Sequence, residues 1–141
     1  MNGALWSRQA TTGGHAMRIV LSGSSTATRR PGWSSATGGE FLPFQLSRFD
    51  SRYATLSVPT PLLRRPSQYF DSNVLATTSG VPSPATVEAL VHLLGPEAVL
   101  FAVVYPCERT GAAVATLERT ALPPEVEHRI GSANARVLLR L

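Results

Sequence analysis

The amino-acid sequence predicts an α/β fold in which three strands form a parallel sheet. Three short, mostly apolar runs each end at small residues or at a proline: MRIVLSG (17–23), NVLATTSG (73–80) and AVLFAVVYP (98–106). A segment of helical spacing follows each run. The runs are apolar almost throughout rather than at alternate positions, which is typical of strands buried on both faces of a parallel sheet. From Arg18 onward the expected order is therefore strand and helix in alternation, three times over.

The clearest helix pattern lies between the second and third strands. In SPATVEALVHLLG (83–95), Ser83 is expected to be the N-cap and Pro84 the first helical residue. Gly95 is expected to end the helix because glycine readily adopts the left-handed backbone of a helix terminus.

The remaining helices are predicted from shorter patterns. Apolar spacing in residues 40–53 indicates a helix, and Ser67 is expected to cap a short helix that runs to Phe70. Two further segments, residues 109–121 and 123–141, predict helices at the C-terminal end of the chain.

The first 39 residues differ in composition from the rest. They contain no Asp or Glu and are rich in Ser, Thr, Gly and Arg. This composition is typical both of a mitochondrial transit peptide and of a disordered tail, and we favour the tail and a cytoplasmic location. We accordingly divide the chain into a low-complexity, poorly ordered segment, residues 1–39, which holds the strand 17–23, and a folded part, residues 40–141.

Charge and hydropathy argue against two classes of partner. The net charge is +4 and all 13 basic residues are arginines. They are scattered and no stacking aromatics interleave with them, so we expect no nucleic acid. No apolar run approaches the ~20 residues of a membrane span, so we expect no membrane association.

Residues that could bind a metal or act as a nucleophile are few and far apart. The histidines, His15, His92 and His128, show no metal-ligand spacing, and each is interpreted as structural or solvated. Cys107 follows the third strand, but a cysteine nucleophile needs a base, and the sequence places no histidine beside it. Its neighbour Glu108 also argues against a reactive thiol.

Four segments in order resemble the C-terminal part of the amidohydrolase-related family of metal-dependent (β/α)8 barrels. They are GEFLPFQLSRFDSRY, RRPSQYFDSNVLATTSG, ALVHLLGPEAVLFAVVYPCE and HRIGSANARVLLRL. Within the family, the chain is most similar to the non-oxidative decarboxylases of γ-resorcylate and 2,3-dihydroxybenzoate. The resemblance covers about residues 40–141 and implies a partial TIM barrel, about its last three βα units. It also implies, for the family, a divalent metal (zinc, manganese or magnesium) and loss of CO2 from an aromatic carboxylic acid.

The resemblance assigns the functional positions one by one. The family motif Gly-His-x-Gly-Glu falls on Ala36–Glu40, so Thr37 stands at the histidine position and Glu40 remains as a candidate catalytic residue. The motif Val-Asp-Tyr-Pro falls on Val103–Pro106, so Val104 stands where the family has an aspartate that binds metal and handles a proton. Valine offers a cation no lone pair, so we expect no metal ligand at these positions and no cofactor in this chain.

Three functional hypotheses follow. In the first, the chain is a partial and inactive descendant of a barrel decarboxylase, or a fragment of one produced by a mispredicted gene. In the second, it is a non-catalytic partner that complements or oligomerises with a full-length homologue, or with itself, through open sheet edges. In the third, it is an enzyme completed by an oligomeric partner.

Overall fold

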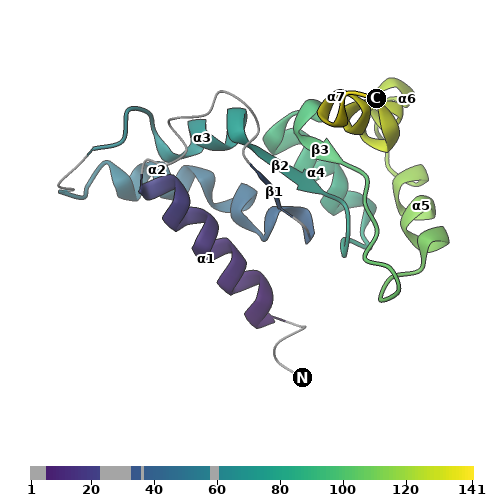
Figure 1. The fold of residues 1–141 in the computed structure, drawn as a ribbon, viewed down its shortest axis with the longest axis horizontal. Helices are drawn as coiled ribbons and strands as arrows, with labels where there is room; N and C mark the ends of the chain where they lie inside the picture. Colours follow the sequence, from purple (N-terminus) through teal and green to yellow (C-terminus); the bar gives the residue numbers. More distant parts are fainter. Residues whose placement is uncertain (1–5, 23–32, 36, 58–60) are drawn as a thin grey trace. The chain divides into compact units, whose positions relative to one another are not determined.

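The computed structural model of the chain describes residues 6–22, 33–35, 37–57 and 61–141 (Figure 1). These residues form two compact units. The first comprises the described residues up to Trp33 together with Glu40–Val74, and the second comprises Ser34–Gly39 and Leu75–Leu141. Among the helices of this part of the chain, none is long and apolar enough to cross a membrane.

The first unit is helical and is built around one apolar cluster. Its elements are α1 (Arg8–Leu21), η4 (Leu42–Gln45), α2 (Leu46–Tyr53) and α3 (Pro66–Asn73). The cluster joins all but α2 through buried side chains, and α2 adds partly buried ones at its margin. The buried members are Ala16, Val20, Leu42, Tyr69, Phe70 and Val74.

The strand predicted over residues 17–23 is wrong, because residues 17–21 lie in α1; Gly23 lies outside the described residues. The buried residues of α1, Gly13, Ala16 and Val20, are three and four positions apart, so they share one helix face. That face covers the apolar cluster. The short run RIVL is compatible with either a strand or one face of a helix. Gly13 and Ala16, which precede it, share a buried helix face with Val20, and this pattern indicates the helix.

The N-cap predicted at Ser67 is also wrong. Helix α3 begins one residue earlier at Pro66, and Arg65 occupies the N-cap position. Ser67 instead ties α3 to α2, because its backbone N–H and its hydroxyl donate to the two carboxylate oxygens of Asp50, at 2.9 and 2.6 Å. Proline suits the first turn of a helix, where its missing N–H costs nothing.

The second unit contains most of a three-stranded sheet. Its order is β1 (Trp33–Ser35), β2 (Val74–Thr77) and β3 (Val99–Leu100). The pairing of β2 with β3 is parallel, with Ala76 opposite Val99, which confirms the predicted parallel arrangement for these strands. Strand β3 is shorter than the predicted run 98–106.

Helix α4 (Pro84–Leu94) connects β2 to β3 through η5 (Pro96–Ala98), beside the two strands (Figure 1). Its predicted limits are confirmed: Ser83 occupies the N-cap position, and Gly95 ends the helix with φ +82° while its N–H bonds the Val91 carbonyl. Both limits of the helix can be predicted from the sequence because proline and glycine constrain the backbone at their own positions.

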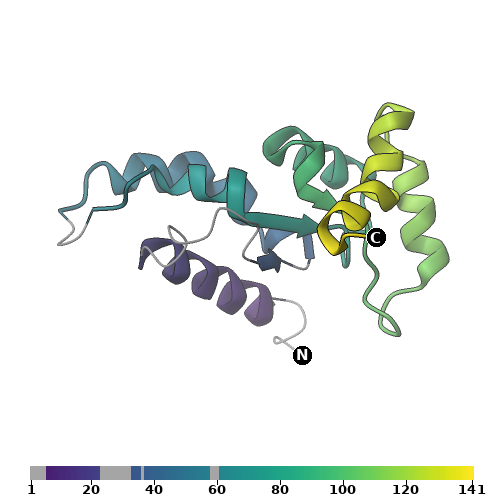
Figure 2. The same ribbon diagram turned by 45° about the horizontal axis from the view of Figure 1, so that its top comes forward.

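The C-terminal segment is helical, as predicted. It contains α5 (Thr110–Glu118), α6 (Pro124–His128), a π-helical turn η6 (Arg129–Ala133) and α7 (Asn134–Leu139). These green-to-yellow helices lie together at one end of this unit (Figure 2). Ile130 of η6 packs in a buried cluster with Leu90 and Val99, which joins the helices to the sheet.

The side of β3 that faces away from β2 is covered by this helical segment. Successive residues of a strand direct their backbone groups to opposite edges, and the Leu100 carbonyl accepts from Thr78 N on the β2 side. The backbone N–H and carbonyl groups of Val99 and Phe101 therefore point away from β2. The Asn134 side chain donates to the Val99 carbonyl at 2.7 Å, and Phe101 N–H donates to the Ile130 carbonyl at 3.0 Å. The open edge expected at this strand is thus occupied over Val99 and Phe101.

Replacing Asn134 with alanine should weaken this unit, because Asn134 donates at 2.7 Å to both the Pro96 and the Val99 carbonyls. We expect the free energy of unfolding to fall by about 1–3 kcal/mol, the cost of leaving buried polar groups unpaired. Thermal unfolding followed by circular dichroism measures the loss. The control Ser132→Ala removes a hydroxyl that bonds the His128 carbonyl within the same helical stretch, and it should cost less. Equal losses in the two variants would contradict this account of the edge.

Candidate functional site at the strand ends

The segments that follow β2 and β3 lie at the carboxyl end of a parallel strand pair. In α/β proteins this is the edge of the sheet where ligands and catalytic groups gather. The segment after β2 begins with buried Thr78 and Ser79, and the segment after β3 runs from Phe101 to Glu108. The geometry of these two segments decides which chemistry this edge could support.

Thr78 continues the strand pairing through its side chain. Its hydroxyl accepts from the Ala102 N–H at 3.2 Å and approaches the Ala102 carbonyl at 3.4 Å. The neighbouring Thr77 and Ser79 hydroxyls are bonded to each other at 2.9 Å. Of these hydroxyls, that of Thr78 joins the segments after β2 and β3.

Glu108 joins the two segments. Its Oε2 accepts from the N–H of Gly80, after β2, and from the N–H of Val104, after β3, each at 3.2 Å. The Glu108 N–H returns a 2.8 Å bond to the Val104 carbonyl. A carboxylate that accepts two backbone N–H groups makes charge-assisted hydrogen bonds. Glu108 therefore fixes the shape of this edge, a role that its position in the sequence did not reveal.

The residues weighed in the sequence as possible ligands or nucleophiles lie apart from one another in the structure. Val104 is 38% exposed and presents only methyl groups. Cys107 is exposed. The histidines are dispersed, with His15 on α1, His92 on α4 and His128 on α6, and all are exposed.

The described residues do not fit a divalent metal. Among them, no three His, Cys, Asp or Glu side chains lie close enough together to hold an ion. The nearest carboxylate along the chain to Val104 is Glu108, which already accepts two backbone hydrogen bonds. Metal binding requires several oxygen or nitrogen ligands at once, and the described residues bring no such set together.

Glu40 lies in the first unit and is buried, with 4% of its surface exposed. Its Oε2 is buried and has no hydrogen-bond partner among the described residues. Burial raises the pKa of the Glu40 carboxyl, and the nearby Arg8 charge partly opposes that rise. Thr37 lies in η3 (Thr37–Gly39), and Ala36 lies outside the described residues.

The turn that carries Glu40 has an unusual backbone. Gly38 and Gly39 have φ values of +67° and +75°, and Glu40 and Phe41 follow with +54° and +56°. The left-handed region costs a non-glycine residue roughly 1–2 kcal/mol. Packing holds the turn, since the Phe41 ring stacks on Trp6 at a centroid distance of 5.7 Å. The family resemblance points to Glu40, but no residue pattern in the sequence indicates the left-handed backbone of Glu40 and Phe41.

The chain is similar over nearly its whole length to curated aromatic-acid decarboxylases. It is 33% identical over 143 aligned positions to gamma-resorcylate decarboxylase of Rhodococcus jostii, an alignment that covers 99% of this chain and 43% of that protein. The chain thus spans less than half the length of the curated relatives that it matches. No family model matches it.

Solved structures show the same partial match. 5-Carboxyvanillate decarboxylase of Sphingomonas paucimobilis superposes with a TM-score of 0.92 and 33% identity, over 100% of this chain and 43% of that one. Dihydroxybenzoic acid decarboxylase of Polaromonas, solved with manganese and the inhibitor 2-nitroresorcinol, gives a TM-score of 0.87 and 28% identity over 96% and 42%. The likeness therefore includes most of residues 1–39, beyond the range of the quoted motifs.

Replacing Glu108 with alanine should loosen both strand-end segments. The N–H groups of Gly80 and Val104 lose their shared acceptor, so we expect faster hydrogen exchange at residues 78–82 and 102–108, measured by NMR or mass spectrometry. Glu108→Gln retains an acceptor oxygen and should keep most of the protection. Unchanged exchange in Glu108→Ala would show that other contacts hold this edge.

Replacing Glu40 with glutamine should stabilise the chain at neutral pH. Because the folded state raises the pKa of Glu40, its stabilising contribution is complete below the ordinary glutamate pKa and is lost as the pH rises through the raised value. We expect the free energy of unfolding of Glu40→Gln to exceed that of the parent chain by about 1 kcal/mol at neutral pH. The difference should vanish in acid. Thermal melts across this pH range measure it. The exposed Glu125→Gln is the control, and the same gain there would refute the assignment to Glu40.

Proposed function

We propose, from the homology of this chain to the gamma-resorcylate and 5-carboxyvanillate decarboxylases, that it forms the last three βα units of such a barrel. The parallel pairing of β2 with β3 supports this assignment. So does the placement of β1 directly before the segment that aligns with the family's Gly-His-x-Gly-Glu motif. The ancestral substrate class is an aromatic carboxylic acid, and the ancestral reaction is its loss of CO2.

We further propose that the 141-residue chain does not catalyse this reaction by itself. The observation that carries the proposal is Val104, which lies in the segment that follows β3 (Val99–Leu100). Loss of CO2 leaves an electron pair on the ring carbon, and a proton must be delivered there. The Val104 side chain carries no acidic proton and no metal-binding oxygen, and the Glu108 carboxylate accepts hydrogen bonds from two backbone N–H groups.

Glu40 does not replace the missing group in this proposal. A general acid or base must reach the reacting atom and must itself be oriented. Glu40 is 4% exposed, and Thr37 stands where the family has the histidine that this glutamate partners. We therefore assign Glu40 to the structure of the turn.

A second candidate function is that of a non-catalytic partner of a full-length homologous barrel, or of another copy of this chain. In this proposal the partner supplies the part of the barrel that lies outside the matched 43% of the solved 5-carboxyvanillate decarboxylase. The covered edge of β3 restricts the mode of association. Val99 and Phe101 already have hydrogen-bond partners, so a partner strand does not pair there and contact must be made through side chains.

A decarboxylation assay tests both candidates. The purified chain is incubated with 2,6-dihydroxybenzoate or 5-carboxyvanillate and Mn²⁺, Zn²⁺ or Mg²⁺, and loss of substrate is followed by chromatography, with a full-length homologous decarboxylase as the positive control. We expect the chain alone to match the rate without protein, because Val104 supplies neither ligand nor proton. Metal-dependent turnover by the chain alone would overturn the proposal. A chain that changes the homologue's activity on mixing would favour the partner function.

A further inference from the structure

The basic charge of the chain is concentrated in the first unit. The stretches that form this unit, Met1–Trp33 and Glu40–Val74, contain eight of the 13 arginines and three of the nine acidic residues, a net charge of +5. The second unit contains five arginines and six acidic residues, a net charge of −1. An anionic partner is therefore attracted to the first unit rather than to the second.

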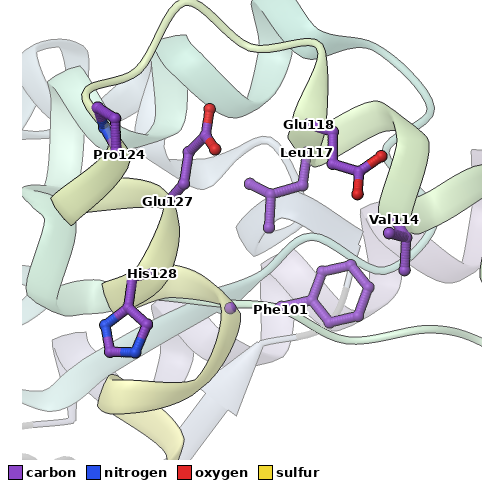
Figure 3. A pocket seen from close by; sticks show the side chains of 8 residues that line it. Phe101, Val114, Leu117, Glu118, Pro124, Glu127 and His128 are labelled. Carbon is purple, nitrogen blue, oxygen red and sulfur yellow. The ribbon is translucent and has the colours of Figure 1, made fainter.

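A groove in the second unit shows the same contrast. It has a volume of about 410 Å³, lies between α5 and the α6–η6 segment, and has an apolar lining that includes Phe101 and Leu117 (Figure 3). The carboxylates of Glu118 and Glu127 border it, on either side of the Leu117 side chain in the view. No arginine lines the groove among the described residues. These carboxylates repel an anionic surface, so we expect contact with such a surface through the first unit.

Arginines and exposed leucines of the first unit occur together at one end of the α2–α3 pair. Figure 1 and Figure 2 both show the described residues after α2 and before α3 extending from this end. Arg52 lies in the last turn of α2, Arg64 and Arg65 directly precede α3, and all three are exposed. Leu56 is 61% exposed and Leu63 86%. We name these five residues the Arg–Leu end.

Hydrogen bonds hold the two sides of this end together. The Leu62 N–H donates to the Tyr53 hydroxyl at 2.6 Å, which places the segment before α3 beside the last turn of α2. The Ser67 N–H and hydroxyl donate to the two carboxylate oxygens of Asp50, which ties the start of α3 to the middle of α2. The arginines on the two sides are therefore held near each other.

The arginines of the Arg–Leu end are not neutralised by the described part of the chain. Asp50 is the one acidic residue in residues 41–70, and both of its carboxylate oxygens accept hydrogen bonds from Ser67. Among the described residues, no carboxylate forms an ion pair with Arg52, Arg64 or Arg65. The three guanidinium groups are thus available to an external anion, and guanidinium binds phosphate oxygens through paired hydrogen bonds.

We propose that the Arg–Leu end binds the surface of a lipid bilayer that contains anionic lipids. Arg52, Arg64 and Arg65 pair with the headgroups, and Leu56 and Leu63 enter the boundary between the headgroups and the acyl chains. Contact with a bilayer surface needs no spanning segment, so it is compatible with the lack of one among the described helices.

The exposed leucines favour a bilayer over a nucleic acid. A phosphate backbone would leave Leu56 and Leu63 in water, whereas a bilayer removes their apolar surface from water. Residues 54–65 also contain no aromatic residue on which a base could stack. Membrane contact by this surface is independent of the proposed decarboxylase ancestry, so the failure of one experiment leaves the other unaffected.

Vesicle sedimentation tests the proposal with the full chain. Vesicles of phosphatidylcholine with about 30% phosphatidylserine should bind the chain, and vesicles of phosphatidylcholine alone should not. Raising NaCl from about 0.1 M to about 0.5 M should weaken the binding because salt screens the charges. Arg64→Glu/Arg65→Glu should weaken it at least about tenfold, since two attractions to the anionic surface become repulsions.

Leu63→Ser separates a bilayer from other polyanions. It should weaken vesicle binding several-fold, because the leucine no longer enters the bilayer, and it should leave any binding to a short double-stranded DNA unchanged. Vesicle binding that Leu63→Ser does not alter, and with which the DNA competes, would show a general polyanion surface and overturn the proposal.

Arg136→Glu/Arg140→Glu is a stringent control, because it makes the same charge change at two exposed arginines beside the exposed aliphatic side chains of α7. This variant should bind anionic vesicles as the parent chain does. A parent chain that does not bind these vesicles would overturn the proposal, as would equal weakening in the two arginine variants. Circular dichroism checks that each variant folds. If Arg64→Glu/Arg65→Glu does not fold, Leu63→Ser decides the outcome, because Leu63 is 86% exposed.

Discussion

The hydrogen bonds from the Asn134 amide to the carbonyls of Pro96 and Val99 hold the second unit together. Strand β3 has two residues, far fewer than an independently stable strand needs. Its β2 side is paired, and its other side would expose backbone groups to solvent or to another chain. On that side the Asn134 side chain and the Ile130 carbonyl make the hydrogen bonds that a neighbouring strand would otherwise make. Ile130 is buried in one cluster with Val99 at the same place.

The strand ends show that architecture and chemistry are separate properties of this fold. Glu108 and Thr78 fix the two segments by bonding backbone groups, and neither interaction involves the side chain of Val104. A valine at position 104 is therefore compatible with an intact edge. In the proposed descent from a decarboxylase, an aspartate at this position could be lost without breaking any of these hydrogen bonds.

The sequence predicts correctly the elements whose limits are set by the backbone preferences of single residues. Helix α4 was predicted to its ends because Pro84 and Gly95 set backbone angles without reference to the rest of the chain. The parallel pairing of β2 with β3 followed from continuous apolar runs joined by a helix. The hydrogen bonds that shape the site cannot be predicted in this way because they join residues far apart in the sequence. Asn134 lies 35 positions from Val99, and Glu108 lies 28 from Gly80. Residues 17–21 were misassigned for a related reason, because the burial of Gly13 against the Glu40 turn was invisible in the short run itself.

The turn at Glu40 limits what a retained motif can say about function. Its left-handed residues and buried carboxyl both cost free energy, and such strain often marks a catalytic site. Here the surrounding packing accounts for it. Gly13 allows the Glu40 carbonyl to approach α1, where an added Cβ would lie 3.3 Å away, and Leu42 then enters the apolar cluster of the first unit. A turn that delivers Leu42 to the core is held by packing whether or not a histidine stands at position 37. The buried Glu40 in its strained turn is therefore explained by packing and is not by itself evidence of catalysis.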